Sequence, residues 1–122
     1  MKRDFDLVRK ILLAVEKETG SGDDRRWLEL ELPGYTAKQV NYHVMLLKEA
    51  QFIRARSFRL LDETTWRPVR LTWRGHEFLD NARNVKVWNQ VMADVRKKGG
   101  SVSWSVLRKL LAAEARAAIE SE

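Results

Sequence analysis

Apolar residues recur with helical spacing near the N-terminus. They follow one another at intervals of three or one positions: Phe5, Val8, Ile11, Leu12 and Val15. Asp4 is suited to cap this helix, because its carboxylate can accept hydrogen bonds from the free N–H groups of the first turn. The helix should end near Glu18, since residues 19–24 are rich in helix breakers and are expected to form a loop.

A strictly alternating pattern follows at 27–32, with a leucine at every second position. Alternation of this kind is typical of a strand with one buried face. The turn pair Pro33-Gly34 would end the strand. The sequence therefore predicts a half-buried strand before the second helix.

A second helix is predicted over 36–50, with Thr36 as its N-cap. Its inward positions again have helical spacing: Val40, His43, Val44, Leu47 and Ala50. His43 on this stripe is expected to be a core histidine with its hydrogen bonds satisfied. Gln51 follows at the position where a left-handed glycine often ends a helix. A left-handed Gln51 would cost about 1–2 kcal/mol.

A two-stranded ribbon is predicted over 53–71. Arg54 and Arg56 share one face of its first strand, and a bulge near Ser57-Phe58 would return the later apolar residues to the inner face. Residues 62–65 are expected to form the tip. Pro68 restricts the returning strand, 66–71, to a sheet edge, because proline has no N–H to donate.

Three helices are expected after the ribbon. Thr72 caps the first, at 73–80, in which Gly75 weakens the first turn. The second ends in basic residues before a glycine pair and has an apolar stripe: Val85, Trp88, Val91, Met92 and Val95. The third starts at Ser101 or Ser103, and four of its residues should face inward: Val106, Leu107, Leu110 and Leu111.

Together these elements predict an α+β fold that is mainly α, ordered helix, strand, helix, two strands and three helices. At 122 residues, the chain should form a single domain, 1–122. Its core is expected at about 4–81, with a C-terminal helical extension at about 84–119. The five tryptophans are expected to anchor the core rather than to stack on ligands: Trp27, Trp66, Trp73, Trp88 and Trp104.

The net charge of +6 is concentrated in the predicted ribbon. Residues 1–50 hold nine basic and nine acidic side chains, whereas 51–76 hold six arginines against only Asp62 and Glu63. Arginine suits phosphate oxygens because its planar guanidinium can donate two parallel hydrogen bonds. This distribution favours a polyanionic partner.

Two stretches carry a resemblance to known proteins. VNYHVMLLKEAQFI at 40–53 resembles the recognition-helix stretch of MarR- and PadR-type winged-helix regulators, and LTWRGHEFL at 71–79 resembles the segment after their wing. The whole chain is also similar to a small family of uncharacterised proteins often found in phages and prophages. This resemblance implies a winged-helix-like domain and a phage- or prophage-type transcriptional regulator that binds double-stranded DNA.

The resemblance also implies which residues contact DNA. On the helix, four side chains would approach the major groove: Lys38, Gln39, Asn41 and Tyr42. On the ribbon, five would contact phosphates: Arg54, Arg56, Arg59, Arg67 and Arg70. The alternative interpretation is that the arginines only prevent edge-to-edge aggregation of the ribbon, and that Asn41 and Tyr42 are ordinary exposed helix residues.

A second hypothesis is a winged-helix protein-interaction module without DNA binding, a modulator of a host or phage complex. The predicted strand at 27–32 leaves no room for the helix that usually precedes the recognition helix. Met45-Leu46 is apolar where such regulators carry polar or basic groups, and could pack on a partner. A homodimer through the last two helices is a further expectation.

Catalysis has little support in the composition. The chain has no cysteine and two histidines, His43 and His76, and it lacks a glycine-rich loop that could hold a phosphate. His76 has no second ligand near it in sequence, so no metal is expected. We therefore expect no enzymatic activity and no cofactor. Without an apolar run of about 20 residues or a signal peptide, a cytoplasmic location without membrane contact is expected.

Overall fold

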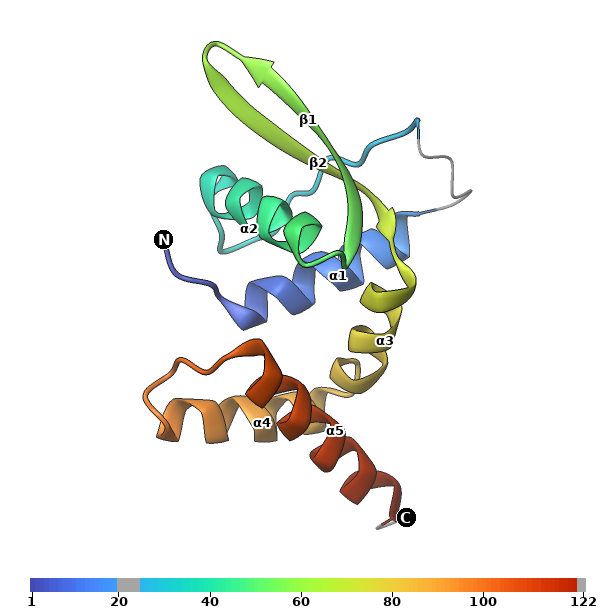
Figure 1. Cartoon of the computed structure of the whole chain (residues 1–122), viewed down its shortest axis with the longest axis vertical. Helices are drawn as coiled ribbons and strands as arrows, with labels where there is room; N and C mark the ends of the chain where they lie inside the picture. Colours follow the sequence, from blue (N-terminus) through green and yellow to red (C-terminus); the bar gives the residue numbers. More distant parts are fainter. Residues whose placement is uncertain (20–24, 121–122) are drawn as a thin grey trace. The chain divides into compact units, whose positions relative to one another are not determined.

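The computed structural model describes residues 1–19 and 25–120. In these residues it contains five helices and one two-stranded antiparallel sheet, in the order α1, α2, β1, β2, α3, α4, α5 (Figure 1). The prediction of an α+β fold that is mainly helical is confirmed. The chain divides into two compact units, Met1–His76 and Glu77–Glu122, which are described separately.

Helix α1, Phe5–Glu18, forms as predicted. Asp4 caps it by accepting a hydrogen bond from the Leu7 N–H at 3.1 Å. Four of the five predicted stripe residues are buried, and Phe5 at the start of the helix is half-buried. Leu7, which the spacing did not single out, is fully buried as well. The helix ends at Glu18, with Thr19 as its C-cap. Apart from Thr19, the loop predicted at 19–24 lies outside the described residues.

The strand predicted at 27–32 is wrong. These residues belong to no sheet, and Leu28 makes a backbone hydrogen bond to the second ribbon strand, from its N–H to the Pro68 carbonyl at 2.7 Å. A continuous ladder cannot form there because Pro68 has no N–H to donate. The neighbouring groups of the same strand, Thr64 O and Trp66 N–H, are bonded instead to the side chain of Asn41.

Helix α2, Ala37–Glu49, starts at Thr36 in a capping box: Gln39 N–H donates to Thr36 Oγ1 at 3.1 Å, and Thr36 N–H donates to Gln39 Oε1 at 2.8 Å. His43, Val44 and Leu47 are buried, as predicted. Ala50, predicted to face inward, is exposed because the helix has ended by that position. Gln51 adopts the left-handed conformation, with φ of 65°.

The ribbon consists of β1, Ile53–Leu60, and β2, Glu63–Leu71. Its tip is a two-residue turn, Leu61 and Asp62, with φ of 50° and 66°. The predicted tip at 62–65 was wrong, because Glu63 and the residues after it already pair with β1. The bulge was also misplaced, since the register shifts between Arg54 and Ala55.

The core of the first unit lies where the base of the ribbon meets α1 and α2 (Figure 1). Ile53 and Leu71 face each other across the two strands and are both buried. Pro68 and Val69 are both buried too, because the bulge turns these consecutive side chains toward the same side. Burial of apolar surface at the base therefore fixes which face of the ribbon is turned inward.

The remaining helices are α3, Trp73–Ala82; α4, Val85–Lys97; and α5, Trp104–Glu120. In the second unit, Phe78 of α3 lies 6.5 Å from the Trp88 ring and 4.8 Å from the Trp104 ring, measured between ring centroids. The α4 stripe is confirmed except at Val85, which is 58% exposed next to the Asn84 cap.

Two residues of α5 are less buried than predicted. Val106 in α5, predicted inward, is 39% exposed, whereas Leu107 is fully buried. One turn later Leu110 is half-buried and Leu111 is buried. The inward stripe of α5 is therefore centred on Leu107 and Leu111, and is narrower than predicted.

The tryptophans do not all anchor the core. Trp88 is buried, and Trp66 and Trp104 are half-buried. Trp27 and Trp73 are exposed to 45% and 82%, so the core role predicted for these two was wrong. Trp27 lies in the segment that forms no strand, and Trp73 is the first residue of α3. No helix in the described parts of the chain is long and apolar enough to cross a membrane.

Candidate nucleic-acid interface

Four of the five ribbon arginines share one side of the sheet. Arg54 pairs directly with Arg70, and Arg56 pairs with Arg67 across the two strands. Directly paired residues point to the same side, and positions two apart along β1 do so as well. We call this surface the arginine face: Arg54, Arg56, Arg67 and Arg70. Arg54 and Arg56 are exposed, and the other two are half-buried.

The arginine face by itself lowers the stability of the ribbon, because like charges directly opposite each other destabilise a strand pair. Arg54, Arg56 and Arg67 form no ion pair with a carboxylate in the described residues. Arg70 donates from Nη1 to the Leu71 carbonyl oxygen at 3.1 Å. Guanidinium groups remain available at three of the four positions, and an incoming anion would relieve their mutual repulsion.

Arg59 lies on the opposite side of the ribbon. It is an odd number of positions from Arg54 and Arg56 along β1, which is regular there, and it pairs with Thr64. Trp66 is on this same side, and Lys48 of α2 places its Nζ 5.3 Å from the Trp66 ring centroid. Helix α2 therefore packs against the side of the ribbon that carries Arg59, away from the arginine face.

The candidate residues on α2 differ in how free their side chains are. Lys38 is exposed. Gln39 is occupied in the capping box at the start of α2. Tyr42 is half-buried, and its ring lies edge-to-face with the His43 ring, with 5.9 Å between the centroids.

Asn41 is also occupied, because it connects α2 to the ribbon. Its Nδ2 donates to the Thr64 carbonyl at 3.1 Å, and its Oδ1 accepts from the Trp66 N–H at 2.6 Å. The amide thus replaces a neighbouring strand along that stretch of β2. The sequence showed Asn41 at an outward position of α2, but nothing in the helical pattern revealed which backbone groups it would meet.

An aromatic pair lies beside the arginines and was not anticipated. Phe58 stays on the arginine face, since β1 has no bulge at that position. The ring of Trp27 packs on it with centroids 4.9 Å apart and an interplanar angle of 59°. Trp27 is nevertheless 45% exposed. The available sequence signal was Phe58 itself, an apolar residue on the charged side of a predicted strand.

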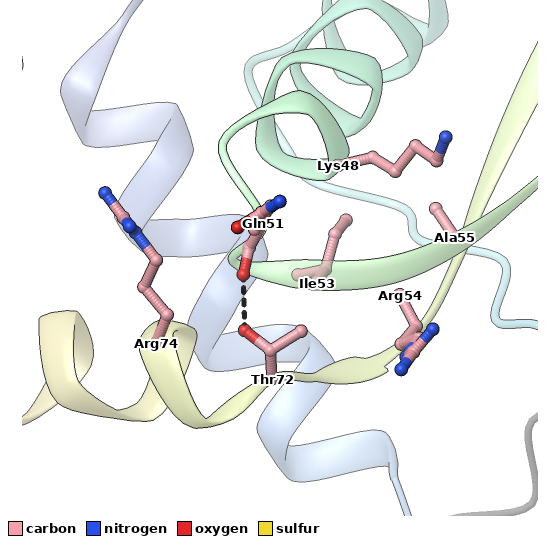
Figure 2. A pocket seen from close by; sticks show the side chains of 7 residues that line it. All are labelled: Lys48, Gln51, Ile53, Arg54, Ala55, Thr72 and Arg74. Carbon is pink, nitrogen blue, oxygen red and sulfur yellow. Dashed lines mark hydrogen bonds between the residues drawn. The ribbon is translucent and has the colours of Figure 1, made fainter.

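A pocket of about 550 Å³ lies beside the start of β1 (Figure 2). Three cationic side chains from three elements line it: Lys48, Arg54 and Arg74; the remaining lining residues are Gln51, Ile53, Ala55 and Thr72, so it includes no carboxylate. Thr72 Oγ1 donates to the Gln51 carbonyl at 2.5 Å and closes one side. Lys48 and Arg74 were not among the predicted site residues, because they lie on different helices and the fold brings them together.

The two histidines have structural contacts. His43 is a satisfied core histidine, as predicted: its Nε2 accepts from the Asp4 N–H at 2.8 Å, and its Nδ1 lies 2.8 Å from the Gln39 carbonyl. Since Nε2 is the acceptor, Nδ1 must carry the proton. His76 lies 3.6 Å from Glu16. The described residues contain no group of three or more metal-ligating side chains of the kind that holds a metal.

Comparison with known proteins identifies relatives of this chain. The family described as "Hypothetical protein (DUF2513)" matches residues 2–101. A protein of Haemophilus influenzae, described as "Uncharacterized protein", is 34% identical over 110 residues, which cover 90% of this chain and 92% of that protein. No solved structure matches. The predicted similarity to a small uncharacterised family is confirmed, and the chain belongs to the DUF2513 family.

Proposed function

We propose that the chain binds double-stranded DNA through the arginine face of its ribbon, as a winged-helix-like regulator of the phage or prophage type. The observation that supports this is that two arginine pairs lie directly opposite each other across β1 and β2, with no carboxylate bonded to Arg54, Arg56 or Arg67 in the described residues. A phosphate backbone supplies the negative charge that this surface lacks. Phosphate contacts of this kind give affinity with little sequence preference.

The contribution of α2 is smaller in this proposal than in a typical winged helix. Gln39 and Asn41 are engaged within the protein, which leaves Lys38 and part of Tyr42 for contact with bases. Arg59 lies on the α2 side of the ribbon and would bind a phosphate there, apart from the other four arginines. Sequence preference should accordingly be modest, because few side chains are free to read base edges.

The test is the salt dependence of binding to a fluorescently labelled duplex, followed by anisotropy. The double variant Arg56→Ala with Arg67→Ala removes one cross-strand pair. It should lower the slope of log affinity against log salt concentration by about 2, because two phosphate contacts are lost. The matched control removes the same charge from exposed residues of α5, Arg108→Ala with Lys109→Ala, and should leave the slope unchanged.

Two results would contradict the proposal. One is an affinity of the native protein for duplex that does not change with salt, or that is absent at low salt. The other is an equal loss of affinity in the α5 control, which would show that only the net charge of the protein matters.

The second candidate, a protein-interaction module, is favoured by the tip of the ribbon. Leu60 is 61% exposed and Leu61 is 99% exposed, next to Asp62 and Glu63, which would repel a phosphate backbone. Exposed apolar side chains at a protruding turn are more suited to a protein partner than to DNA. Capture from nuclease-treated bacterial lysate tests this: a partner should bind the native chain but not a Leu60→Ser, Leu61→Ser variant. Loss of every partner after nuclease treatment would count against it.

A further inference from the structure

The two edges of the ribbon are used differently. In an antiparallel pair, the N–H and C=O groups of alternate residues point away from the partner strand. On β2 the bonds to Asn41 and Leu28 show that Thr64, Trp66 and Pro68 point outward. Their cross-strand partners must then point outward from β1, and these are Arg59, Ser57 and Ala55.

The outer edge of β2 is closed by the protein itself. Asn41 bonds to Thr64 and Trp66, the Leu28 N–H bonds to the Pro68 carbonyl, and Pro68 offers no N–H. An additional strand would have to displace these bonds before it could pair there. This edge is therefore not a docking surface.

The outer edge of β1 remains open. Within the described residues, β1 has β2 as its only sheet partner, and no other backbone hydrogen bond involves Ala55, Ser57 or Arg59. Ser57 and Arg59 are exposed, and Ala55 is half-buried in the lining of the cationic pocket. Three consecutive outward positions are enough to pair with a short extended peptide.

The charge around this edge indicates the kind of peptide. Arg54 and Arg56 project from β1 on one side, and Lys48 and Arg74 line the pocket at its start (Figure 2). Residues 50–61 contain no acidic side chain. A second copy of the chain is a poor occupant, because pairing β1 with β1 would bring the arginines of both copies together.

We propose that the open edge of β1 binds an extended acidic peptide of a partner protein, which adds to the ribbon as a third strand. Its backbone pairs with Ala55, Ser57 and Arg59, and its carboxylates lie over Arg54 and Arg56. Strand addition of this kind obtains affinity from main-chain hydrogen bonds and specificity from alternate side chains. The proposal does not rest on DNA binding, since it depends on backbone groups that a duplex does not need.

The experiment uses the full chain and a fluorescein-labelled peptide of alternating glutamate and valine residues, with binding followed by anisotropy. Ser57→Pro removes an outward N–H and leaves the β1–β2 ladder intact, so it should weaken peptide binding at least about tenfold. The control Thr64→Pro introduces the same residue at an outward position of β2 and should leave the affinity unchanged. Duplex binding should survive Ser57→Pro, which separates this site from the proposed DNA contacts.

Two further probes separate strand addition from simple charge attraction. The same peptide with N-methylated amides keeps its carboxylates but cannot form the ladder, and should bind at least about tenfold more weakly. Amide hydrogen exchange at Ala55, Ser57 and Arg59 should slow when the unmodified peptide binds.

Four outcomes would overturn the proposal. They are no binding of the peptide, equal binding of the N-methylated peptide, equal weakening by Thr64→Pro, and self-association through β1 seen by light scattering and abolished by Ser57→Pro. The last would identify a second copy of the chain as the occupant.

Discussion

The base of the ribbon and its outer half are held by different forces. At the base, Ile53 and Leu71 are 3% and 4% exposed and pack with the core residues of α1 and α2. The outer half, 56–67, is mostly exposed, and its attachments include the Asn41 side chain, the Trp27–Phe58 contact and Lys48 over the Trp66 ring. The base is positioned by apolar burial, whereas the outer half is positioned by a few specific contacts. Changes at the base should therefore affect the whole unit, and changes farther out should act locally.

The largest effect is expected from Gly75→Ala, which disturbs the base. A Cβ at this position would lie 2.1 Å from the backbone oxygen of Phe52, which accepts the Thr72 N–H at 3.0 Å. Backbone must move to make room, and we expect a loss of about 3 kcal/mol in the free energy of unfolding, measured with urea. Helix propensity alone predicts the opposite, a gain of about 1 kcal/mol.

Gly34→Ala is the matched comparison for Gly75→Ala. Gly34 has φ of 88° and no atom within 4 Å of the added Cβ. Its replacement should cost only the strain of a left-handed alanine, about 1 kcal/mol. An equal cost at both positions would show that close packing at Gly75 is unimportant.

The next effect is expected from Asn41→Ala, which detaches the outer half from α2. Thr64 O and Trp66 N–H lose their partner, and the free energy of unfolding should fall by about 2 kcal/mol. Hydrogen exchange should accelerate at the Trp66 amide while the amides at the base remain protected. Asn89→Ala, at an exposed position of α4, is the control and should have almost no effect. Faster exchange at the base would contradict the separation of the two halves.

A gain is expected from Gln51→Gly, at the junction between α2 and the base. Gln51 has φ of 65°, a conformation that glycine adopts without the steric cost of a Cβ. The variant should be more stable by about 1 kcal/mol in urea denaturation. Ala50→Gly, one residue earlier in right-handed geometry with φ of −74°, should instead be destabilising. A loss of stability in both variants would argue that the side chain of Gln51 matters.

The sequence predicts well those parts that depend on apolar spacing and local capping. Helix α1, the capping residue Thr36 and most of the α4 stripe follow from short-range patterns, because caps and stripes involve residues within a few positions of one another.

The parts that could not be predicted depend on long-range partners. The alternation at 27–32 is real, yet no strand forms, because β2 has few backbone groups left to pair with it. The side chain of Asn41 already bonds to Thr64 O and Trp66 N–H, and Pro68 has no N–H. The bulge at Arg54/Ala55 decides which arginines share a face, and it arises where Pro68 and Val69 are both drawn into the core. Neither the absence of a strand at 27–32 nor the position of the bulge can be predicted from the apolar pattern of that segment alone.

The smallest effect is expected from Arg56→Thr, on the arginine face of the outer half. The substitution removes the repulsion with Arg67 and introduces a residue that is well suited to strands, so stability should rise by about 0.5 kcal/mol at low salt. Added salt should reduce the gain, because it screens the repulsion in the native protein. Arg59→Thr is the control, since its cross-strand partner is the uncharged Thr64 and no salt-dependent gain is expected. If Arg56→Thr is destabilising at every salt concentration, Arg56 contributes packing to the ribbon, and its presence requires no anionic partner.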